Sequence, residues 1–347
     1  MSDTSSNLRL GIDFGGTKTE IIGLDANNGK ELYRKRIPTA RDDYQKTLDS
    51  FKGLIDEAEK NLGMTGTIGM SIPGSISQDT GTIKNANSTW MIGKPLQDDL
   101  EKMMGREIRI QNDANCFAVS EATDGAAQGE KVVFGVIIGT GCGGGVVING
   151  QPIMGANGIG GEWGHNPLPN PRTYIPKGTE LSGFIEHIKD LSAYTYPHIT
   201  HDKNWNETPG PACYCGRRNC LELWLSGTGF KRDYKQVTNE ELSTHDVITN
   251  ARQGEPKAVA ALERYTDRLA RALGNVINLL DPDVIVLGGG MSNVADLYEE
   301  VPKIWGKYIF SDFVHTKLKS PIHGDSSGVR GAAWLWPSKA SNKKKAA

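Results

Sequence analysis

The sequence has no excess of charge of either sign, no long apolar run and few cysteines. Its 347 residues include 39 Lys and Arg against 41 Asp and Glu, a net charge of −2, which leaves no electrostatic footprint for nucleic acid or an acidic membrane surface. No apolar run approaches the roughly 20 residues of a spanning helix, and residues 1–7 lack the apolar segment of a signal peptide. Five cysteines, an odd number, favour a reducing compartment over a disulfide framework. We therefore expect a cytoplasmic protein with small-molecule partners.

The chain is long enough for two domains, because a single core usually stops growing at roughly 250 to 300 residues. Apolar segments at 8–13 and 132–138 are typical of buried strands, and each runs through a glycine-rich turn into a second strand. This strand, turn and strand unit is the one internal repeat that we find. It predicts two related α/β halves.

The first glycine turn is a candidate phosphate site. Gly15 and Gly16 lack a Cβ, so backbone N–H groups and the hydroxyls of Thr17 and Thr19 could approach a phosphate there. Asp13, at the end of the preceding strand, would face the metal ion that accompanies the phosphate. A plain hairpin turn explains the same residues.

Two further glycine turns follow apolar strands. The loop Gly139, Thr140 and Gly141 could hold the other end of a triphosphate, although a turn that serves only sheet curvature remains an alternative. At Gly288, Gly289 and Gly290 a purine or ribose could approach the backbone.

Residues 112–115, Asn-Asp-Ala-Asn, lie between a predicted strand at 107–110 and a predicted helix that extends to Ala122. Asp113 could simply cap that helix. An ionised Asp at the end of a strand could also accept a proton from a substrate hydroxyl. In phosphoryl transfer a positioned carboxylate of low pKa suffices for this role.

Three of the cysteines lie within eight residues, downstream of a histidine between glycine and asparagine. One imidazole and three thiolates form the Cys3His set of a closed structural zinc site, which folds a loop and does no chemistry. Three ordinary cysteines are the alternative. Such a site would hold Glu162 and Glu222 near one another. The predicted ligands are His165, Cys213, Cys215 and Cys220.

Two polar segments leave alternatives open. The insertion 166–212 is interpreted as a lobe tethered by the metal, with His187, His198 and His201 as alternative ligands and one helical pattern at 181–191. In the loop 85–90, the asparagines are either turn residues or amides that bind a polyhydroxylated ligand beside Trp90.

Taken in order, these motifs resemble the signature of the ROK family of sugar kinases over about residues 8–336. Within the family, several segments most resemble bacterial fructokinases, which also include manno(fructo)kinases. These segments are 73–75, 85–90, 164–169 and 323–333.

The resemblance implies a two-domain, actin-like ATPase fold of the ribonuclease H type, with a zinc-tethered lobe in the larger domain. The smaller α/β domain would comprise residues 1–122 and be completed by a C-terminal helix at 324–338. The larger would comprise 123–323, with the zinc lobe at 165–222 and the active cleft between the domains. The resemblance also implies a homodimer.

The resemblance also implies a role for each site residue. Asp113 would be the general base, Asp13 would orient Mg2+, and His165 would bind zinc through one ring nitrogen and sugar through the other. The sugar would be bound by Asn87, Asn112, Asp113, Glu162, His165 and Glu222. ATP would be bound by Asp13, Gly15, Gly16, Thr17, Lys18, Gly139, Thr140, Gly141, Gly288, Gly289 and Gly290.

The function expected from this resemblance is ATP-dependent phosphorylation of a free hexose, D-fructose and also mannose, at its 6-hydroxyl. The alternative is a kinase for N-acetylglucosamine or glucose, which needs space that Trp90 and its loop could fill. A non-catalytic sugar-binding regulator is disfavoured because Asp13 and Asp113 are both present. A DNA-binding repressor is disfavoured because the first strand begins by residue 8.

Overall fold

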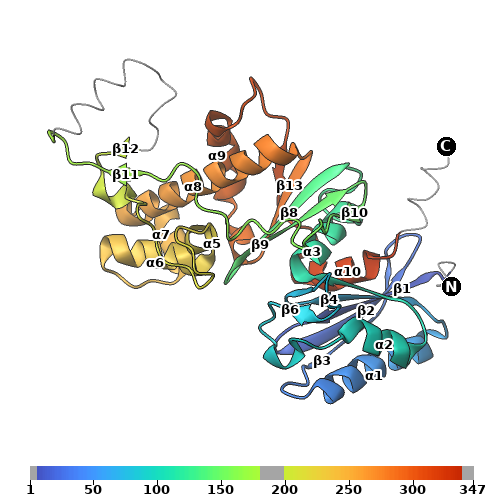
Figure 1. Ribbon diagram of the computed structural model, residues 1–347. Helices are drawn as coiled ribbons and strands as arrows, with labels where there is room; N and C mark the ends of the chain where they lie inside the picture. The colour runs from blue at the N-terminus through green and yellow to red at the C-terminus, as the bar shows by residue number, and fades with distance from the viewer. Residues whose placement is uncertain (1–5, 180–198, 338–347) are drawn as a thin grey trace.

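The computed structural model describes residues 6–179 and 199–337. Its first sheet has five strands in the order β3-β2-β1-β4-β7 (Figure 1). The hairpin of β1 and β2 is antiparallel, whereas β4 and β7 continue from β1 as parallel strands. The strands are β1 (Leu8–Phe14), β2 (Lys18–Asp25), β3 (Glu31–Pro38), β4 (Thr67–Ile72) and β7 (Ile108–Asn112).

The second sheet repeats this plan with the order β10-β9-β8-β13-β14. Here β8 and β9 form the antiparallel hairpin, and β13 and β14 are the added parallel strands. The predicted internal repeat is therefore confirmed in the strand order. The strands are β8 (Val132–Ile138), β9 (Cys142–Ile148), β10 (Gln151–Pro152), β13 (Val284–Gly288) and β14 (Lys317–Lys319).

Helices α1 (Tyr44–Leu62) and α2 (Leu96–Met104) cover the outer face of the first sheet (Figure 1). Their apolar residues, such as Phe51 and Leu100, share a core with Leu10 and Ile12 of β1. On the same side lie the short strands β5 (Ser75–Ile76) and β6 (Ile83–Lys84) and the 3-10 turn η1 (Thr89–Met91).

Two helices lie between the sheets, α3 (Asp113–Thr123) and α10 (Ser327–Trp334), the latter preceded by η5 (Gly324–Ser326). They cross closely because α10 has a glycine at the crossing: a Cβ on Gly331 would lie 1.6 Å from the carbonyl oxygen of Cys116. Gly69 of β4 likewise lets α10 approach the first sheet, since its Cβ would lie 1.8 Å from the Ala332 oxygen. Helix α10 thus packs on the sheet formed by the first strands of the chain.

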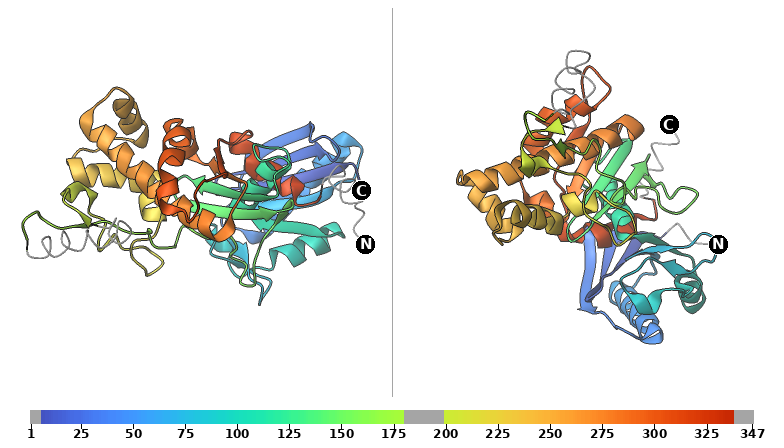
Figure 2. Two further views of the ribbon diagram at one scale, coloured as in Figure 1. Left: turned by 90° about the horizontal axis from the view of Figure 1, so that it is seen from above. Right: turned by 60° about the vertical axis from the view of Figure 1, so that its left-hand side comes forward.

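The remaining helices lie on the face of the second sheet that points away from α3 and α10 (Figure 2). The longest, α8, buries Leu269 and Leu273 in one core with Val136 and Leu287 of the sheet. These helices are α5 (Glu222–Leu225), α6 (Gly227–Thr238), α7 (Thr244–Arg252), α8 (Pro256–Leu280) and α9 (Asp296–Trp305), with η3 (Gly290–Asn293) and η4 (Gly306–Tyr308) beside them.

The described part of the insertion forms the two-stranded sheet of β11 (Thr173–Tyr174) and β12 (Ile199–Thr200), followed by η2 (Lys203–Trp205). It is attached to α8 through Glu207, a fully buried acid that accepts hydrogen bonds from Arg268 and Arg271. The helix predicted at 181–191 and the alternative ligands His187 and His198 lie outside the described residues. The domain boundaries predicted above stay a prediction.

Candidate active site

Two cavities lie at the carboxyl ends of the strands. The first cavity has a volume of about 670 Å3 and the second about 450 Å3, both within the range of roughly 300 to 1,000 Å3 that is common for small-molecule sites. On the wall of the first are the predicted residues Asn87, Asn112, Glu162 and His165. On the wall of the second are Asp13, Asp113, Gly288, Gly289 and Gly290.

Asp113 is the first residue of α3 but does not cap it. The cap is Asn112, whose Oδ1 accepts a hydrogen bond of 2.9 Å from the Asn115 backbone N–H. Asp113 accepts one from the Ala114 N–H at 2.8 Å, and its side chain is exposed to the cleft. The surrounding walls still desolvate it, and this raises the pKa of its carboxyl. Asn112 therefore provides the helix cap, and capping does not explain the acid at position 113.

Asp13 lies at the end of β1, on the same cavity as Asp113. The pKa of Asp13 is raised to about 6, mainly by burial; the negative charges of Asp113 and Glu20 contribute to this rise, whereas a hydrogen bond with Ser71 and the charge of Arg36 oppose it. Among the described residues Asp13 forms no ion pair. Two carboxylates that face one cavity without a cation between them suit a divalent ion with oxygen ligands.

The two predicted phosphate loops are tight hairpin turns. In the first, Gly15 N–H donates to the Lys18 oxygen at 3.0 Å, and in the second, Gly139 N–H donates to the Gly141 oxygen at 3.0 Å. Neither turn lies on the walls of the two cavities. The Thr19 hydroxyl, considered above as a phosphate ligand, is instead buried against the Thr39 hydroxyl at 3.1 Å.

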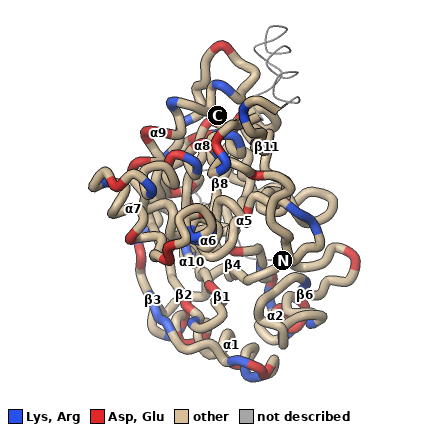
Figure 3. The backbone as a smooth tube through the Cα atoms, turned by 90° about the vertical axis from the view of Figure 1, so that its left-hand side faces the viewer, with Lys and Arg blue, Asp and Glu red and all other residues tan. Residues whose placement is uncertain are grey.

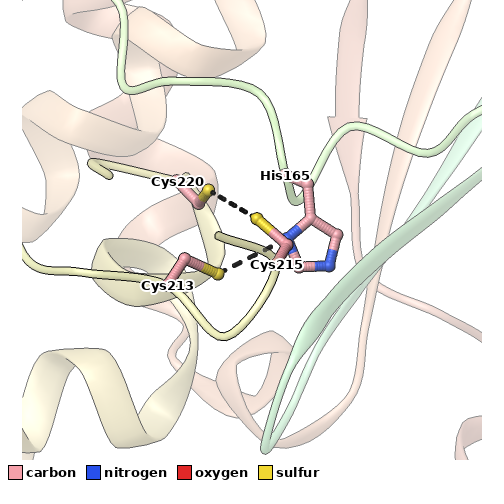
Figure 4. A group of neighbouring side chains, drawn as sticks. All are labelled: His165, Cys213, Cys215 and Cys220. Carbon is pink, nitrogen blue, oxygen red and sulfur yellow. Dashed lines mark hydrogen bonds between the residues drawn. The ribbon is translucent and has the colours of Figure 1, made fainter. Parts of the chain in front are cut away.

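The four predicted zinc ligands converge although they come from two loops (Figure 4). Their donor atoms all lie within 4.8 Å of one another. His165 Nδ1 is 3.6 Å from Cys213 Sγ, and Cys215 Sγ is 3.6 Å from Cys220 Sγ. Zinc–sulfur bonds of about 2.3 Å imply tetrahedral edges of about 3.8 Å, so these residues could hold a zinc ion. The other ring nitrogen of His165 lies 2.9 Å from the Tyr214 hydroxyl.

The two glutamates beside this cluster are close enough for the charge of one to affect the pKa of the other. Burial raises the pKa of Glu162; nearby His165 opposes this, whereas the charges of Glu222 and Asp113 add to it. Glu222 Oε2 accepts a hydrogen bond of 3.2 Å from the Cys142 N–H and does not line the first cavity. Its predicted contact with sugar stays a prediction.

The first cavity also has wall residues that sequence reasoning missed, including Gln111, Asn115 and Met154. Gln111 and Asn115 lie within two residues of the Asn112–Asp113 pair in the sequence, and this proximity could have identified them as site residues. Trp90, in contrast, turns away from the cavity: its indole N–H donates to Thr47 Oγ1 at 3.2 Å, and its ring packs edge-on against Phe14. The space beside the asparagine loop is therefore not filled by Trp90.

The sequence profile of one protein family matches residues 9–339, and this family is ROK. The chain belongs to the ROK family. Two curated relatives of this ROK chain are the N-acetyl-D-glucosamine kinases of Yersinia pseudotuberculosis, 39% identical with 94% of this chain and 97% of the relative covered, and of Pectobacterium atrosepticum, 38% identical with the same coverage. A ROK hexokinase from Thermus thermophilus has a similar structure, with a TM-score of 0.75 and 27% identity over 97% of this chain and 99% of that one.

These comparisons confirm the family and the mixed-sheet α/β fold of the ROK chain. They do not support the expected likeness to fructokinases in particular, because the relatives at this identity are named as N-acetyl-D-glucosamine kinases. The alternative stated above is thus favoured over the main expectation. Within the ranges that the structure describes, no helix is both long and apolar enough to cross a bilayer, and charges of both signs are spread along the chain (Figure 3).

Proposed function

We propose that this ROK protein is an ATP-dependent kinase that phosphorylates the 6-hydroxyl of a hexose, with N-acetyl-D-glucosamine as its first candidate substrate. One observation carries the proposal. Asp113, a carboxylate with no capping role, lies on the second cavity beside Asp13, while its neighbour Asn112 lies on the first. A general base at this junction could serve a sugar on one side and a nucleotide on the other.

In this proposal the sugar occupies the first cavity. Asn87, Asn112, Glu162 and His165 bind its hydroxyls from the wall, with Glu222 behind them. Asp113 accepts the proton of the 6-hydroxyl as that oxygen attacks the γ-phosphate. ATP extends through the second cavity, with its adenosine at Gly288–Gly290 and its phosphates toward the hairpin turns 15–18 and 139–141. Closure of the cleft would exclude water, which otherwise competes as the acceptor.

Two metal sites belong to the proposal. Asp13, which faces the second cavity without an ion pair among the residues described, would hold Mg2+. Bound there, Mg2+ would neutralise charge on the phosphates. Zinc, held by His165 and the three cysteines, would be structural because all four positions are protein ligands. The cluster borders the first cavity through His165 and Cys215, so it would shape that wall.

Three observations favour N-acetyl-D-glucosamine. Relatives that cover nearly the whole chain carry that name. Trp90 leaves the space beside the asparagine loop open. The first cavity also has apolar wall residues, among them Ile110, Met154 and Ile159, that suit the methyl of an acetamido group.

D-Fructose is the second candidate, for a different reason. The segments 73–75 and 85–90 carry the resemblance to fructokinases, and residues of both line the first cavity: Gly74, Ser75, Asn85, Ala86 and Asn87. Residues that face the sugar are those that decide between sugars. This observation keeps fructose in the substrate test.

The test is a coupled assay of ADP release with N-acetylglucosamine, fructose, mannose and glucose as acceptors. We expect the highest kcat/KM with N-acetylglucosamine and product phosphorylated at the 6-position. A preference for fructose would replace the first candidate by the second and leave the kinase proposal intact. Sugar binding without turnover of any of the four sugars would instead indicate a non-catalytic regulator.

A further inference from the structure

Two amide side chains that line the first cavity have no role in the function proposed above. They are Gln111 and Asn115. Gln111 is the residue before the cap of α3, and Asn115 is in the first turn of that helix. Asn115 is 8% exposed, and its Nδ2 donates to Gln111 Oε1 at 3.0 Å. This hydrogen bond fixes the orientation of the Gln111 amide, because its oxygen is held on the Asn115 side.

The Gln111 amide nitrogen has no strong acceptor among the residues described. Nε2 faces the sulfur of Met154, and a thioether is only a weak acceptor. The opposite orientation of the amide would put its oxygen against that sulfur, which has no hydrogen to donate, so the N–H side is favoured there. Asn115 Oδ1 also lacks a partner within the described ranges. An amide pair on a cavity wall, with Asn115 buried and Gln111 half-buried, that has unfilled hydrogen-bonding capacity points to a ligand.

The side chains around the Gln111 nitrogen indicate what that ligand group is. Met154 contacts the Gln111 amide, and Ile110 lines the same cavity, so an acceptor oxygen with an apolar group beside it would fit there better than a bare hydroxyl. An acetamido group has this chemistry, since its carbonyl accepts and its methyl is apolar.

We propose that Gln111 is a specificity-determining residue whose Nε2 donates a hydrogen bond to the acetamido carbonyl of the substrate, and that Asn115 positions it. The inference rests on the proposed function, and it names the residue that recognises the substituent at C2 of the sugar. Asn112, Glu162 and His165 would bind hydroxyls that all hexoses share, whereas Gln111 would distinguish an acetamido sugar from glucose.

The experiment compares wild type with Gln111→Leu and Gln111→Glu. Loss of one hydrogen bond should raise the KM for N-acetylglucosamine about tenfold. The KM of glucose, or its inhibition constant if it is not turned over, should change less than about twofold. The carboxylate of Gln111→Glu has no N–H to donate and should raise the KM at least as much. Gln45→Leu is the matched control, because Gln45 lies exposed on α1, away from both cavities, and its side chain donates to Asp49.

The outcomes separate this inference from the function on which it rests. An active wild type whose KM for N-acetylglucosamine is unchanged in Gln111→Leu overturns the inference alone. Equal losses for N-acetylglucosamine and glucose also overturn it, because they indicate a general structural role. A wild type that uses fructose and not N-acetylglucosamine overturns the proposed substrate together with the inference.

Discussion

Replacing Asp113 by asparagine would remove the proposed base with little change of shape. The amide oxygen of Asn can still accept the 2.8 Å hydrogen bond from the Ala114 N–H, and the cap of α3 is unaffected because Asn112 provides it. General-base catalysis typically contributes about 10²- to 10⁴-fold in rate. We therefore expect kcat to fall by that factor, or about 3 to 5 kcal/mol of transition-state stabilisation, while the KM for sugar changes little.

The stability of this variant can be predicted from the sign of the pKa shift. Desolvation by the walls of the cleft raises the pKa of Asp113 in the folded protein, so folding favours its protonated form. The associated stability is present at low pH and is lost as the pH rises through the raised pKa. At neutral pH the ionised side chain therefore costs stability, and Asp113→Asn should melt at the same temperature as wild type or higher. Lost activity would then not reflect unfolding.

The pH profile is a further readout. In wild type, kcat should decrease as the pH falls through the raised pKa of Asp113, because the protonated acid cannot accept a proton. The variant should lack that limb. Its Asp13 should also titrate lower than about 6, since one neighbouring negative charge that raises its pKa is gone.

Single-turnover kinetics, calorimetric sugar binding and thermal melting would measure these effects. Asp56→Asn is a suitable control, because Asp56 is an exposed acid on α1 that pairs only with Lys52 among the described residues. Turnover within about threefold of wild type would remove Asp113 from the base role. Loss of sugar binding in parallel with turnover would instead assign it to binding.

Two further predictions concern the second half of the chain. Metal analysis of the purified protein should find one zinc per chain, and Cys215→Ser should lose it and destabilise the loop; a folded variant that keeps its zinc would refute the ligand assignment. Glu207→Gln should lower the free energy of unfolding by roughly 3 to 5 kcal/mol, because it leaves the charges of Arg268 and Arg271 buried without that partner. Denaturant unfolding would measure this, and a change below about 1 kcal/mol would show that Asp233 and Asp267, which also pair with these arginines, suffice.

Several predictions from sequence could be made because their signals are local. Glycine turns after apolar strands marked the two hairpins, and the polar junction at residues 112–115 marked the start of α3. Cysteine spacing with an upstream histidine indicated the cluster that the structure brings within 4.8 Å. The choice between fructose and N-acetylglucosamine could not be made in this way, since it depends on which side chains face the sugar. One of the two alternatives for the loop 85–90 put Trp90 beside the ligand, whereas its half-buried ring packs against the core of the first sheet.

By itself, the sequence determined the kinds of element, the repeated strand and turn unit, the histidine and cysteine pattern of the candidate metal site and the resemblance to ROK proteins, because each depends on residues close together in the chain or on their order. Only the tertiary structure decided that Asn112 and not Asp113 caps α3, that Asp13 and Asp113 share a cavity, and that Gln111 lines the other one with an amide nitrogen that meets only the weak acceptor Met154 among the described residues. Those facts depend on how β7, α3 and the second sheet meet. Contacts between segments far apart in the chain have no local signature, so folding has to bring them together before they can be seen.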